Sequence, residues 1–448
     1  MQFEQALSYL LSLGHETLTI KLGLRNTEVL LDALGNPQNN FPAVQIAGTN
    51  GKGSVAVFLD SICRDSGIRT GRFTSPHLIS ITERIQINNA PIATDDFARF
   101  TAEVKSAAEQ LIKDQELETL PTFFEHVTAI SLLAFREAAV DLAILETGLG
   151  GRLDSTTAAR ADIVAITPVA MDHEEYLGNS IEEIAAEKAA IIRPGVTAVI
   201  APQDERPMKV IIARCKETAI DPVLVQADDS DRHVDSSRFC NATWLSALPD
   251  GRGRIAVRTQ DDLYEDVLLG LRGRHQLANA ATAVALADSL RERGFAISRD
   301  AIVKGLANAT HAGRLELWTG KPPWLFDGAH NPAAAAALGD YLDEFVPGPI
   351  TMIFGAMRDK RLPEMAKMLF PKAAQLILTE IDNPRAAEIE VLKAAVPAEF
   401  DPANIHIAQS VREALTIARD ITPADGLICV TGSLYLVGEA LREVSPPG

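Results

Sequence analysis

The sequence predicts an α/β protein with a large N-terminal domain and a smaller, doubly wound C-terminal domain. The chain has 448 residues, which is more than a single hydrophobic core usually organises. Apolar runs of strand length alternate with helical stretches in both parts of the chain, as in folds built around parallel sheets. A glycine-rich loop follows the first of these runs. We expect the first domain at residues 1–310 and the second at 311–448.

The N-terminal part begins with residues 1–40, which are predicted to be helical in a stretch that ends at Pro42. Residues 43–47 form an apolar run that predicts a buried strand, and the segment GTNGKGS (48–54) follows it directly. A helical period then continues to Gly67. Strand, glycine loop and helix is the context that a phosphate-binding loop requires, so we expect a P-loop NTPase-like domain.

The rest of the first domain continues the alternation. Helices are predicted at 123–138, 180–195 and 275–294, and strands at 142–146 and 162–167. Ser180 and Glu183 form the capping-box pattern at the start of the second of these helices. Residues 196–270 are expected to be irregular, apart from a hairpin at Asp250-Gly251.

The second domain is expected to be a small Rossmann-like fold. Its strand-like runs are separated by helical stretches and lie at 324–327, 351–356, 374–380, 404–408 and 427–432. So many alternating units in a short segment are typical of a parallel sheet that is wound on both sides.

Composition limits the kinds of partner. The formal net charge of −18 argues against nucleic acid, because such binding needs a basic face. The four cysteines are far apart and match no disulfide or zinc pattern, which favours a reducing compartment. The N-terminus lacks the basic and apolar regions of a secretory signal, and no apolar run has the length of a membrane span. We expect a cytoplasmic protein with no nucleic-acid or membrane partner.

The glycine-rich loop is a variant of the common phosphate-binding loop. The usual spacing is GxxxxGK[ST], whereas here Gly53 stands between Lys52 and Ser54. Glycines let backbone N–H groups approach phosphate oxygens, Lys52 can reach the terminal phosphates, and Ser54 can contact magnesium. A tight strand-to-helix turn without a ligand is the structural alternative.

Two further polar positions follow predicted strands. Glu146 ends the strand at 142–146 with glycines directly after it, and Asp172-His173 follows the strand at 162–167. Ligands of α/β proteins gather at the carboxyl ends of parallel strands. Glu146 and His173 can therefore share a magnesium ion, although nitrogen is an unusual ligand for this hard cation. The alternatives are a solvated glutamate in a turn and a hydrogen-bonded loop histidine.

Lys188 occupies an unusual position. It lies on the apolar stripe of its predicted helix, together with Ile181, Ile184, Ala185 and Ile192. A lysine on the core-facing side of a helix either extends its amine to water or is retained for function. The helical pattern alone leaves both interpretations open.

Other polar residues have ordinary structural explanations when each is taken alone. They are the hydroxyl-rich loop RFTSPHL at 72–78, Asn279 in an alanine-rich helix, Arg314 after the domain junction, and Asp327 and His330 at the end of a strand.

Taken together, these segments resemble the folylpolyglutamate synthase/dihydrofolate synthase family, a branch of the Mur-ligase-like ATP-dependent ligases. The similarity runs from GLRNT (23–27) to TGSLYLVGE (431–439) and is weakest across 200–270. The motifs that carry it are AGTNGKGS, TSPHL, TFFE, LETGLGGRLDSTT, MDHEEYLG, EKAAIIRPG, HQLANAATA, AGRLE, DGAHNP and TGSLY. The inserted Gly53 is a feature of the folate branch, whereas the muramyl-peptide ligases typically lack it.

The resemblance implies a ligase of folate biosynthesis, polyglutamylation and one-carbon metabolism. In this family ATP phosphorylates a carboxylate of the pterin substrate, and the amine of L-glutamate attacks the acyl phosphate to give an amide. The implied cofactors are ATP, two Mg²⁺ ions and a carbamylated Lys188, which explains a lysine on an apolar stripe. Pterin or folate, L-glutamate and ATP are the implied small-molecule partners, and we expect a monomer.

The resemblance also implies roles for individual residues. The catalytic residues are Lys52, His173 and Lys188. The ATP contacts are Asn50, Gly51, Lys52, Gly53, Ser54, Asn279, Arg314, Asp327 and His330, which places the nucleotide between the two domains. The metal ligands are Ser54, Ser75, Glu146, His173 and Lys188. The residues at the pteridine ring are Thr122, Phe124 and Asp154.

Three positions depart from the family pattern. Ala312 stands before Gly313-Arg314 where proline is usual, Tyr176 stands where tryptophan is frequent, and Arg25 stands where glutamate is common. The last of these leaves the contacts of the GLRNT segment with the pterin open.

Other functions compete with this interpretation. A muramyl-peptide or cyanophycin-type ligase has a similar fold and mechanism, but TFFE and GLGGRLDSTT speak against it. A P-loop kinase or switch NTPase has no use for Lys188 or for a second domain. A non-catalytic binding protein is disfavoured because every expected site residue is present. The sequence leaves open whether dihydropteroate, tetrahydrofolate or both are substrates.

Overall fold

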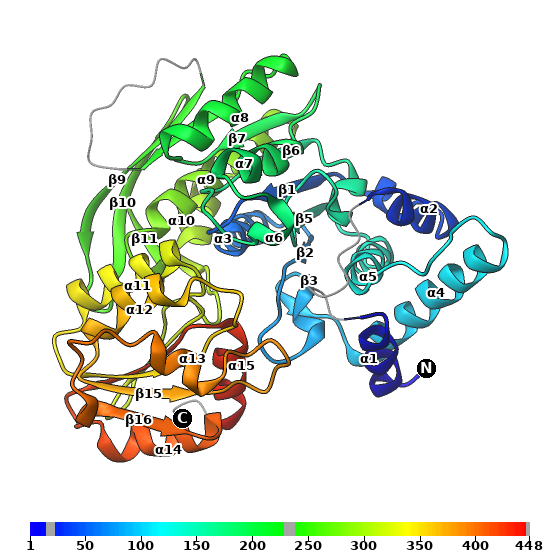
Figure 1. The fold of residues 1–448 in the computed structure, drawn as a ribbon. Coiled ribbons are helices and arrows are strands. Elements are labelled where there is room, and N and C mark those ends of the chain that lie inside the picture. The colour runs from blue at the N-terminus through cyan, green and yellow to red at the C-terminus, as the bar shows by residue number, and fades with distance from the viewer. Residues whose placement is uncertain (15–22, 228–237, 445–448) are drawn as a thin grey trace. The chain divides into compact units, whose positions relative to one another are not determined.

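The computed structural model describes residues 1–14, 23–227 and 238–444 (Figure 1). The chain forms two compact units. The first comprises Met1–Thr243, Val257–Glu265 and Ala278–Asn308, and the second comprises Trp244–Ala256, Asp266–Leu277 and Ala309–Gly448. The predicted α/β architecture with a large N-terminal and a smaller C-terminal domain is confirmed. The boundary between residues 310 and 311 stays a prediction.

An eleven-stranded sheet organises the first unit, in the order β11-β10-β9-β8-β7-β6-β1-β5-β2-β3-β4. Its strands are β1 (Ala43–Ala47), β2 (Thr70–Phe73), β3 (Ile85–Ile87), β4 (Ala90–Pro91), β5 (Leu142–Glu146), β6 (Ile163–Ile166), β7 (Thr197–Ile200), β8 (Val223–Ala227), β9 (Phe239–Ala247), β10 (Arg252–Thr259) and β11 (Leu263–Arg272). Parts of β9, β10 and β11 belong to the second unit.

The helices of this part of the chain connect the strands. They are α1 (Phe3–Ser12), α2 (Arg25–Ala33), α3 (Lys52–Asp65), α4 (Thr94–Lys113), α5 (Phe123–Glu137), α6 (Glu174–Leu177), α7 (Ile181–Ala189), α8 (Glu205–Glu217), α9 (Gln276–Glu292) and α10 (Arg299–Asn308), with short 3-10 helices at Pro37–Asn40, Ile81–Arg84 and Ser155–Ala159. Residues 15–22 of the predicted N-terminal helical stretch lie outside the described residues.

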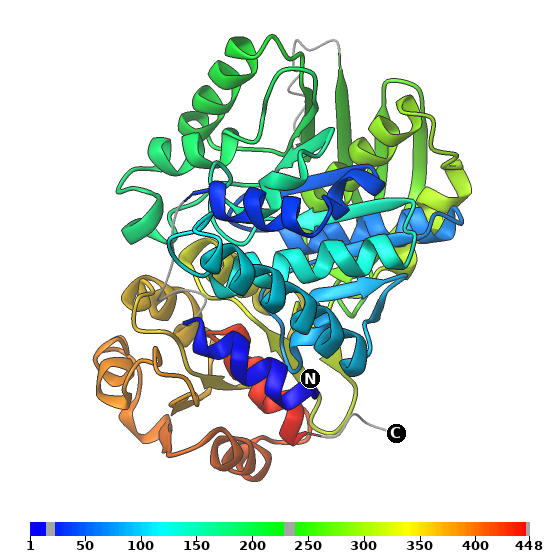
Figure 2. The same ribbon diagram turned by 90° about the vertical axis from the view of Figure 1, so that its right-hand side faces the viewer.

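The central strands are buried on both faces, which explains their continuous apolar runs. Strand β1 pairs in parallel with β5 and with β6. Ala43, Ala143 and Leu145 belong to a core with residues of α1, α2, α4 and α5, which pack against one another (Figures 1 and 2). Val44 and Ile46 alternate with Ala43 and therefore point to the opposite face.

The prediction for residues 196–270 was wrong, because the described part of this segment is regular. It contains β7, α8 and β8 and continues into β9, β10 and β11. The outer strands were missed because buried, half-buried and exposed positions mix along them, as in β9, which weakens the apolar run. The predicted hairpin is confirmed, since Gly251 adopts a φ of +79° in the turn between β9 and β10.

The helix predicted at 180–195 is shorter in the structure. The capping box of Ser180 and Glu183 is present, but α7 ends at Ala189. Beyond that point Ile192 N–H bonds to Ala189 O, a three-residue spacing that closes the last turn before Pro194.

The second unit contains a six-stranded sheet in the order β12-β13-β17-β14-β15-β16. Its strands are β12 (Glu316–Trp318), β13 (Trp324–Asp327), β14 (Ile350–Phe354), β15 (Gln375–Thr379), β16 (Ile405–Ala408) and β17 (Leu427–Thr431). Its helices are α11 (Pro332–Phe345), α12 (Leu362–Leu369), α13 (Ile389–Ala394), α14 (Val411–Ile421) and α15 (Leu434–Glu443), with 3-10 helices at Phe370–Lys372 and Pro402–Asn404. All five predicted strands are present and parallel, and only β12 adds an antiparallel edge.

The structure also bears on the expectations about the cysteines and about membrane-spanning segments. Cys63, Cys215, Cys240 and Cys429 are buried free thiols. Within the three described ranges, none of the helices is both long enough and apolar enough to cross a bilayer.

Candidate active site

Four loops meet at one edge of the large sheet. The strands β6, β1, β5 and β2 are parallel neighbours, so the segments that follow them leave the sheet on the same side. These segments begin near Gly48, Thr74, Thr147 and Thr167. They carry most of the residues that the sequence singled out in the first domain, as expected for the carboxyl edge of a parallel sheet.

The loop after β1 is tightly constrained by its glycines. Gly51 has a φ of +89°, and a Cβ atom there would lie 2.3 Å from the side-chain oxygen of Asn279. Gly48 has a φ of +148°, and a Cβ atom there would lie 1.9 Å from the hydroxyl of Thr167. Both positions therefore require glycine for space as well as for backbone conformation. Asn279, an expected nucleotide contact, lies against the loop.

Helix α3 begins at Lys52, directly after this loop. The first backbone N–H groups of a helix have no partner within it and carry partial positive charge. Gly53 and Ser54 stand in this first turn, so the loop and helix together present an anion-binding end. The predicted strand, loop and helix are all present.

The side chain of Lys52 folds back over the loop. Its Nζ donates to the carbonyl oxygens of Gly48 and Thr49, each at 3.2 Å. The same Nζ lies 4.0 Å from Oε1 of Glu146, and the other oxygen of Glu146 accepts a hydrogen bond from Ser75 N–H at 3.2 Å. The buried carboxylate of Glu146, at the end of β5, is thus met by two other predicted site residues, Lys52 at the start of α3 and Ser75 in the loop after β2.

The loop after β5 lies against helix α7. A Cβ atom on Gly151 would lie 2.9 Å from the carbonyl oxygen of Glu187 and 3.0 Å from that of Lys188. Arg152 N–H also donates to Glu187 O at 2.9 Å. The glycines of the GLGGR segment therefore allow this loop to pack directly on the last turn of α7.

Lys188 is buried, with 4% exposure, and does not extend its amine to water. Its Nζ donates to Gly48 O at 2.9 Å. Burial, and then the nearby charge of Lys52, lower the pKa of Lys188 to about 7, although Asp172 and Asp154 act in the opposite direction. A substantial fraction of this amine is consequently neutral near pH 7.

The loop after β6 carries Asp172 and His173. Thr49 and Ala170 exchange hydrogen bonds at 3.0 Å, which fasten this loop to the glycine loop. His173 has a φ of +51°, and its N–H donates to a carboxylate oxygen of Asp172 at 2.9 Å. The backbone conformation of His173 and its hydrogen bond to the Asp172 carboxylate therefore fix where the His173 side chain projects from the loop.

The predicted pteridine residues lie on α5 and in the loop after β5. Thr122 caps α5, and the ring of Phe124 lies over Gly148, where a Cβ atom would be 2.4 Å from the ring. Asp154 accepts hydrogen bonds from the N–H groups of Gly148 and Leu149, each at 2.9 Å. Burial raises the pKa of Asp154, and these hydrogen bonds oppose that rise. Asp154 therefore holds the loop on which Phe124 rests.

A separate group of predicted residues lies in the second unit. Asp327 accepts hydrogen bonds from the N–H groups of Leu315 and Ala329, both at 2.9 Å. Arg314 and His330 both contact the carbonyl oxygen of Gly328, at 3.2 and 2.9 Å. Burial raises the pKa of Asp327, and the charge of Arg314 opposes this. The three expected nucleotide contacts of this unit are therefore clustered at the end of β13.

The donor set fits a hard cation only in part. Glu146 offers a carboxylate and Ser54 and Ser75 offer hydroxyls, which are the oxygen donors that magnesium prefers. The other predicted ligands are His173 and Lys188, and each offers a nitrogen unless Lys188 is carbamylated. In the part of the chain that the structure describes, no three acidic, histidine or cysteine side chains form a ready metal cluster. A metal at Glu146 would need hydroxyl, phosphate or carbamate oxygens to complete its shell.

One group in the candidate site, the carbonyl oxygen of Gly48, was not predicted from the sequence. The carbonyl oxygen of Gly48 accepts hydrogen bonds from both Lys52 and Lys188. A backbone acceptor has no side-chain signal, and Lys188 is 140 residues away from Gly48 in sequence. The glycine at the end of a buried strand was the only available indication.

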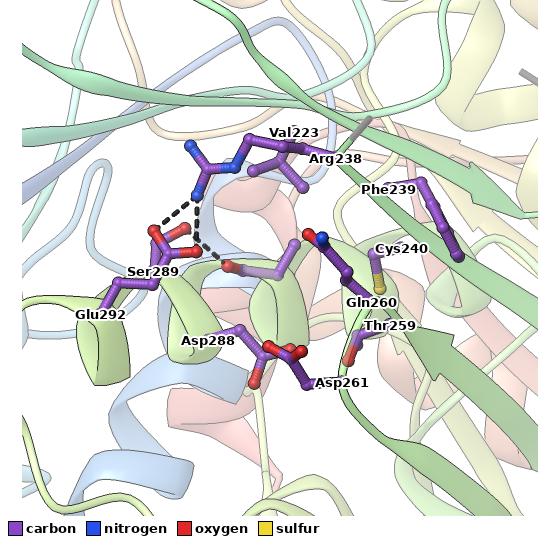
Figure 3. A pocket seen from close by; sticks show the side chains of 11 residues that line it. Val223, Arg238, Phe239, Cys240, Thr259, Gln260, Asp261, Asp288, Ser289 and Glu292 are labelled. Carbon is purple, nitrogen blue, oxygen red and sulfur yellow. Dashed lines mark hydrogen bonds and ion pairs between the residues drawn. The ribbon is translucent and has the colours of Figure 1, made fainter. Parts of the chain in front are cut away.

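A small pocket lies elsewhere in the first unit, apart from the residues described above. Its cavity is about 30 Å³, which suits a single water molecule and no nucleotide or pterin. Across it Arg238 pairs with Glu292, with both carboxylate oxygens accepting from the guanidinium (Figure 3).

Comparisons with known proteins agree with this geometry. The Mur ligase middle domain matches residues 46–287, and the Mur ligase glutamate ligase domain matches residues 313–434. The dihydrofolate synthase/folylpolyglutamate synthase of Bacillus subtilis is 34% identical over 432 residues, which are 95% of each chain. The chain belongs to the folylpolyglutamate synthase/dihydrofolate synthase family. It spans half the length of another relative, the probable bifunctional folylpolyglutamate synthase/dihydropteroate synthase of Haloferax volcanii, at 34% identity over 98% of this chain.

Solved structures of the family share the fold. The folylpolyglutamate synthase of Mycobacterium tuberculosis, complexed with ADP, is 31% identical and has a TM-score of 0.89 over 99% of each chain. A bifunctional folylpolyglutamate synthase/dihydrofolate synthase with Mn, AMPPNP and L-glutamate bound is 26% identical. Its TM-score is 0.82 over 99% of this chain and 98% of that one.

Proposed function

We propose that this protein is an ATP-dependent ligase that joins L-glutamate to dihydropteroate, to a reduced folate, or to both. A carboxylate is a poor electrophile, so ATP would first convert the pterin carboxylate into an acyl phosphate, which the glutamate amine then attacks. The observation that carries the proposal is the convergence of Lys52, Glu146 and Ser75 beside a glycine loop that opens on a helix N-terminus. Family membership supports the same chemistry.

We propose that the nucleotide phosphates bind at residues 50–54. The first N–H groups of α3 supply donors, and the ammonium group of Lys52 needs only to exchange two carbonyl partners for phosphate oxygens. Asn279 lies against Gly51, which supports a contact with the same ligand. Such a site lowers the barrier mainly by positioning the phosphates and neutralising charge.

We propose that Glu146, Ser54, Ser75 and His173 hold Mg²⁺ when ATP is present. The metal supplies charge neutralisation for the transferred phosphoryl group. The Ser75 N–H group orients the Glu146 carboxylate, and the nearby Lys52 ammonium offsets part of its negative charge. Manganese in a related structure supports a divalent cation in this family.

We propose that Lys188 is carbamylated and supplies oxygen ligands to a second metal ion. Carbon dioxide adds only to a neutral amine, which releases one proton to water as the carbamate anion forms, and the pKa of about 7 makes the neutral amine available at neutral pH. Because the Lys188 side chain is buried beside Gly48, its carbamate group would lie close to the glycine loop. A positive amine at that place would instead repel magnesium.

We propose that the pteridine ring binds near Thr122, Phe124 and Asp154. The half-buried ring of Phe124 offers an aromatic face, held by Gly148 on one side and by Phe73 at 5.7 Å between ring centroids. Asp154 contributes by holding the loop under that ring. In the second unit, Arg314, Asp327 and His330 remain the proposed nucleotide contacts.

The deciding experiment is a product assay with purified protein. ATP, magnesium and L-glutamate would be combined separately with dihydropteroate, with tetrahydrofolate and with a muramyl-peptide precursor, and the products would be identified by mass spectrometry. A pterin product larger by one glutamyl residue, with matching ADP release, supports the proposal. Product from the muramyl precursor alone, or ADP release that is the same without glutamate, would favour a peptidoglycan ligase or a simple NTPase.

Two further expectations stay proposals. The four free, buried thiols fit a reducing cytoplasm. The monomeric state can be measured by light scattering of the purified chain.

A further inference from the structure

The first turn of α5 is held from two directions by buried side chains. The backbone N–H of Thr122 donates to Glu125 Oε2 at 2.7 Å, and the carbonyl oxygen of Thr122 is 3.1 Å from Nδ1 of His126. Glu125 and His126 are 5% and 0% exposed. Both peptide groups that flank the Thr122 side chain are thus fixed by neighbouring side chains.

These contacts favour one tautomer of His126. A carbonyl oxygen can only accept a hydrogen bond, so a neutral ring that makes this contact carries its proton on Nδ1, facing Thr122 O, and the carbonyl oxygen of Pro121 is a further acceptor for the ring. The lone pair on Nε2 then accepts from the hydroxyl of Tyr9, at 3.1 Å. The Tyr9 and His126 rings also meet edge to face, with centroids 5.6 Å apart. The hydrogen-bond chain therefore runs in one direction, from Tyr9 through His126 to Thr122.

A second chain reaches the same turn from another helix. The hydroxyl of Thr27, on α2, donates to Glu125 Oε1 at 3.2 Å, and Thr27 is fully buried. Tyr9 stands on α1, so the two helices that precede β1 each send one hydroxyl to the turn that bears Thr122 and Phe124. Tyr9 is not among the residues expected to contact ATP, metal or substrate, whereas Thr27 ends the GLRNT segment, whose contacts with the pterin are open.

We propose that Tyr9 and His126 are positioning residues for the pterin site, which orient Thr122 and Phe124 through the directed chain of hydrogen bonds. Thr27 and Glu125 act on the same turn. The inference rests on the proposed function, because it takes Thr122 and Phe124 as substrate contacts. Burial lowers the pKa of His126 to about 4, so the ring is neutral at neutral pH.

The test is a double-mutant cycle on the full-length protein, with Tyr9→Phe, His126→Phe and the combined variant. The pterin that the wild type uses would be varied at saturating ATP and glutamate. Each single change should raise the pterin KM about fivefold, the value of one hydrogen bond, while the ATP KM stays within about twofold. The combined variant should be no worse than either single variant, because both break the same chain.

Ser131→Ala is the matched control. Ser131 lies on α5, is 1% exposed, and donates to Thr128 O, so its loss also removes one buried hydrogen bond. It should lower Tm by a similar amount and leave the pterin KM unchanged. An unchanged pterin KM in folded Tyr9→Phe, an equal rise in the ATP KM, additive effects in the cycle, or a rise in the control would each overturn the proposal.

Failure of this inference can be distinguished from failure of the proposed function. If the wild-type protein turns over no pterin, the proposed function fails. If it does so with normal kinetics while Tyr9→Phe has the same pterin KM, only the positioning role fails. Should His126→Phe not fold, Tyr9→Phe removes a single oxygen atom from a half-buried ring and decides the question alone.

Discussion

Lys52 and Lys188 donate hydrogen bonds to the same carbonyl oxygen, that of Gly48. Two amines directed at one acceptor repel each other, and this repulsion contributes to the lowered pKa of Lys188. The arrangement is relieved if Lys52 moves to phosphate or if Lys188 becomes an anion. The shared acceptor thereby links Lys52 to phosphate binding and Lys188 to carbamylation, and a substitution of each lysine tests its proposed role.

Replacing Lys52 by alanine should abolish ligation without unfolding the protein. The side chain is 16% exposed and covers the loop, so its removal takes away charge and little packing. We expect kcat to fall roughly 100-fold or more, as when one donor to a reacting group is removed. The measurement is glutamate incorporation beside a thermal melt. Lys209→Ala, which removes an exposed partner of Glu205, is the control, and near-normal turnover in Lys52→Ala would disprove the phosphate-loop assignment.

Gly51→Ala should weaken ATP binding far more than Gly67→Ala. The two glycines flank α3, with φ of +89° and +78°, so each substitution bears about 1–2 kcal/mol of backbone strain. At Gly51 the new Cβ would also lie 2.3 Å from Asn279, whereas nothing lies within 4 Å of it at Gly67. Both variants should melt earlier, and only Gly51→Ala should raise the ATP KM. Equal KM values in the two variants would contradict a nucleotide site at the loop.

Lys188→Ala should be nearly inactive and partly rescued by acetate or formate. A short carboxylate can enter the vacated space and replace the proposed carbamate oxygens as metal ligands. Lys188→Met fills the same space without an amine, so it should be inactive and show no rescue. Activity would be followed against acetate concentration at constant ionic strength. Wild-type turnover in Lys188→Met would exclude any chemical role for this amine.

Acid should destabilise the protein partly through His126. The pKa of His126 is about 6.5 in the unfolded chain and about 4 in the folded state, because burial disfavours the charged form of the ring. Between these values the unfolded chain binds more protons, so stability falls as the pH is lowered, by roughly 1.4 kcal/mol per pH unit. His126→Gln cannot titrate and should lose less Tm between pH 7 and pH 5 than the wild type. An equal loss in both proteins would contradict a buried neutral histidine. His275, whose pKa burial also lowers to about 4, contributes equally to both and cancels.

The sequence predicted the parts of the molecule that depend on local pattern. The run at 43–47, the glycine loop and the following helix are specified by neighbouring residues, and all three are present. The core-facing position of Lys188 followed from helical periodicity, whereas the burial of its amine did not, because the pattern also allows the amine to extend to water. The chain from Tyr9 to His126 joins residues 117 positions apart, and no local pattern carries such a contact. Of the outer strands, only the hairpin turn between β9 and β10 was predicted, and the extent of β9 to β11 was not, because their burial is partial.

The parallel arrangement of four neighbouring strands, β6, β1, β5 and β2, also indicates where a fluorophore or tag can be attached away from the candidate site. The loops after these four strands, which carry most of the proposed site residues of the first domain, leave the sheet at the carboxyl edge, so the turns that enter these and the neighbouring parallel strands lie at the opposite edge. Pro194 and Gly195 form such a turn before β7, both are exposed, and a Cβ atom at Gly195 would meet nothing within 4 Å. A fluorophore or a short peptide tag inserted there would lie at the edge of the sheet opposite the proposed phosphate and metal residues.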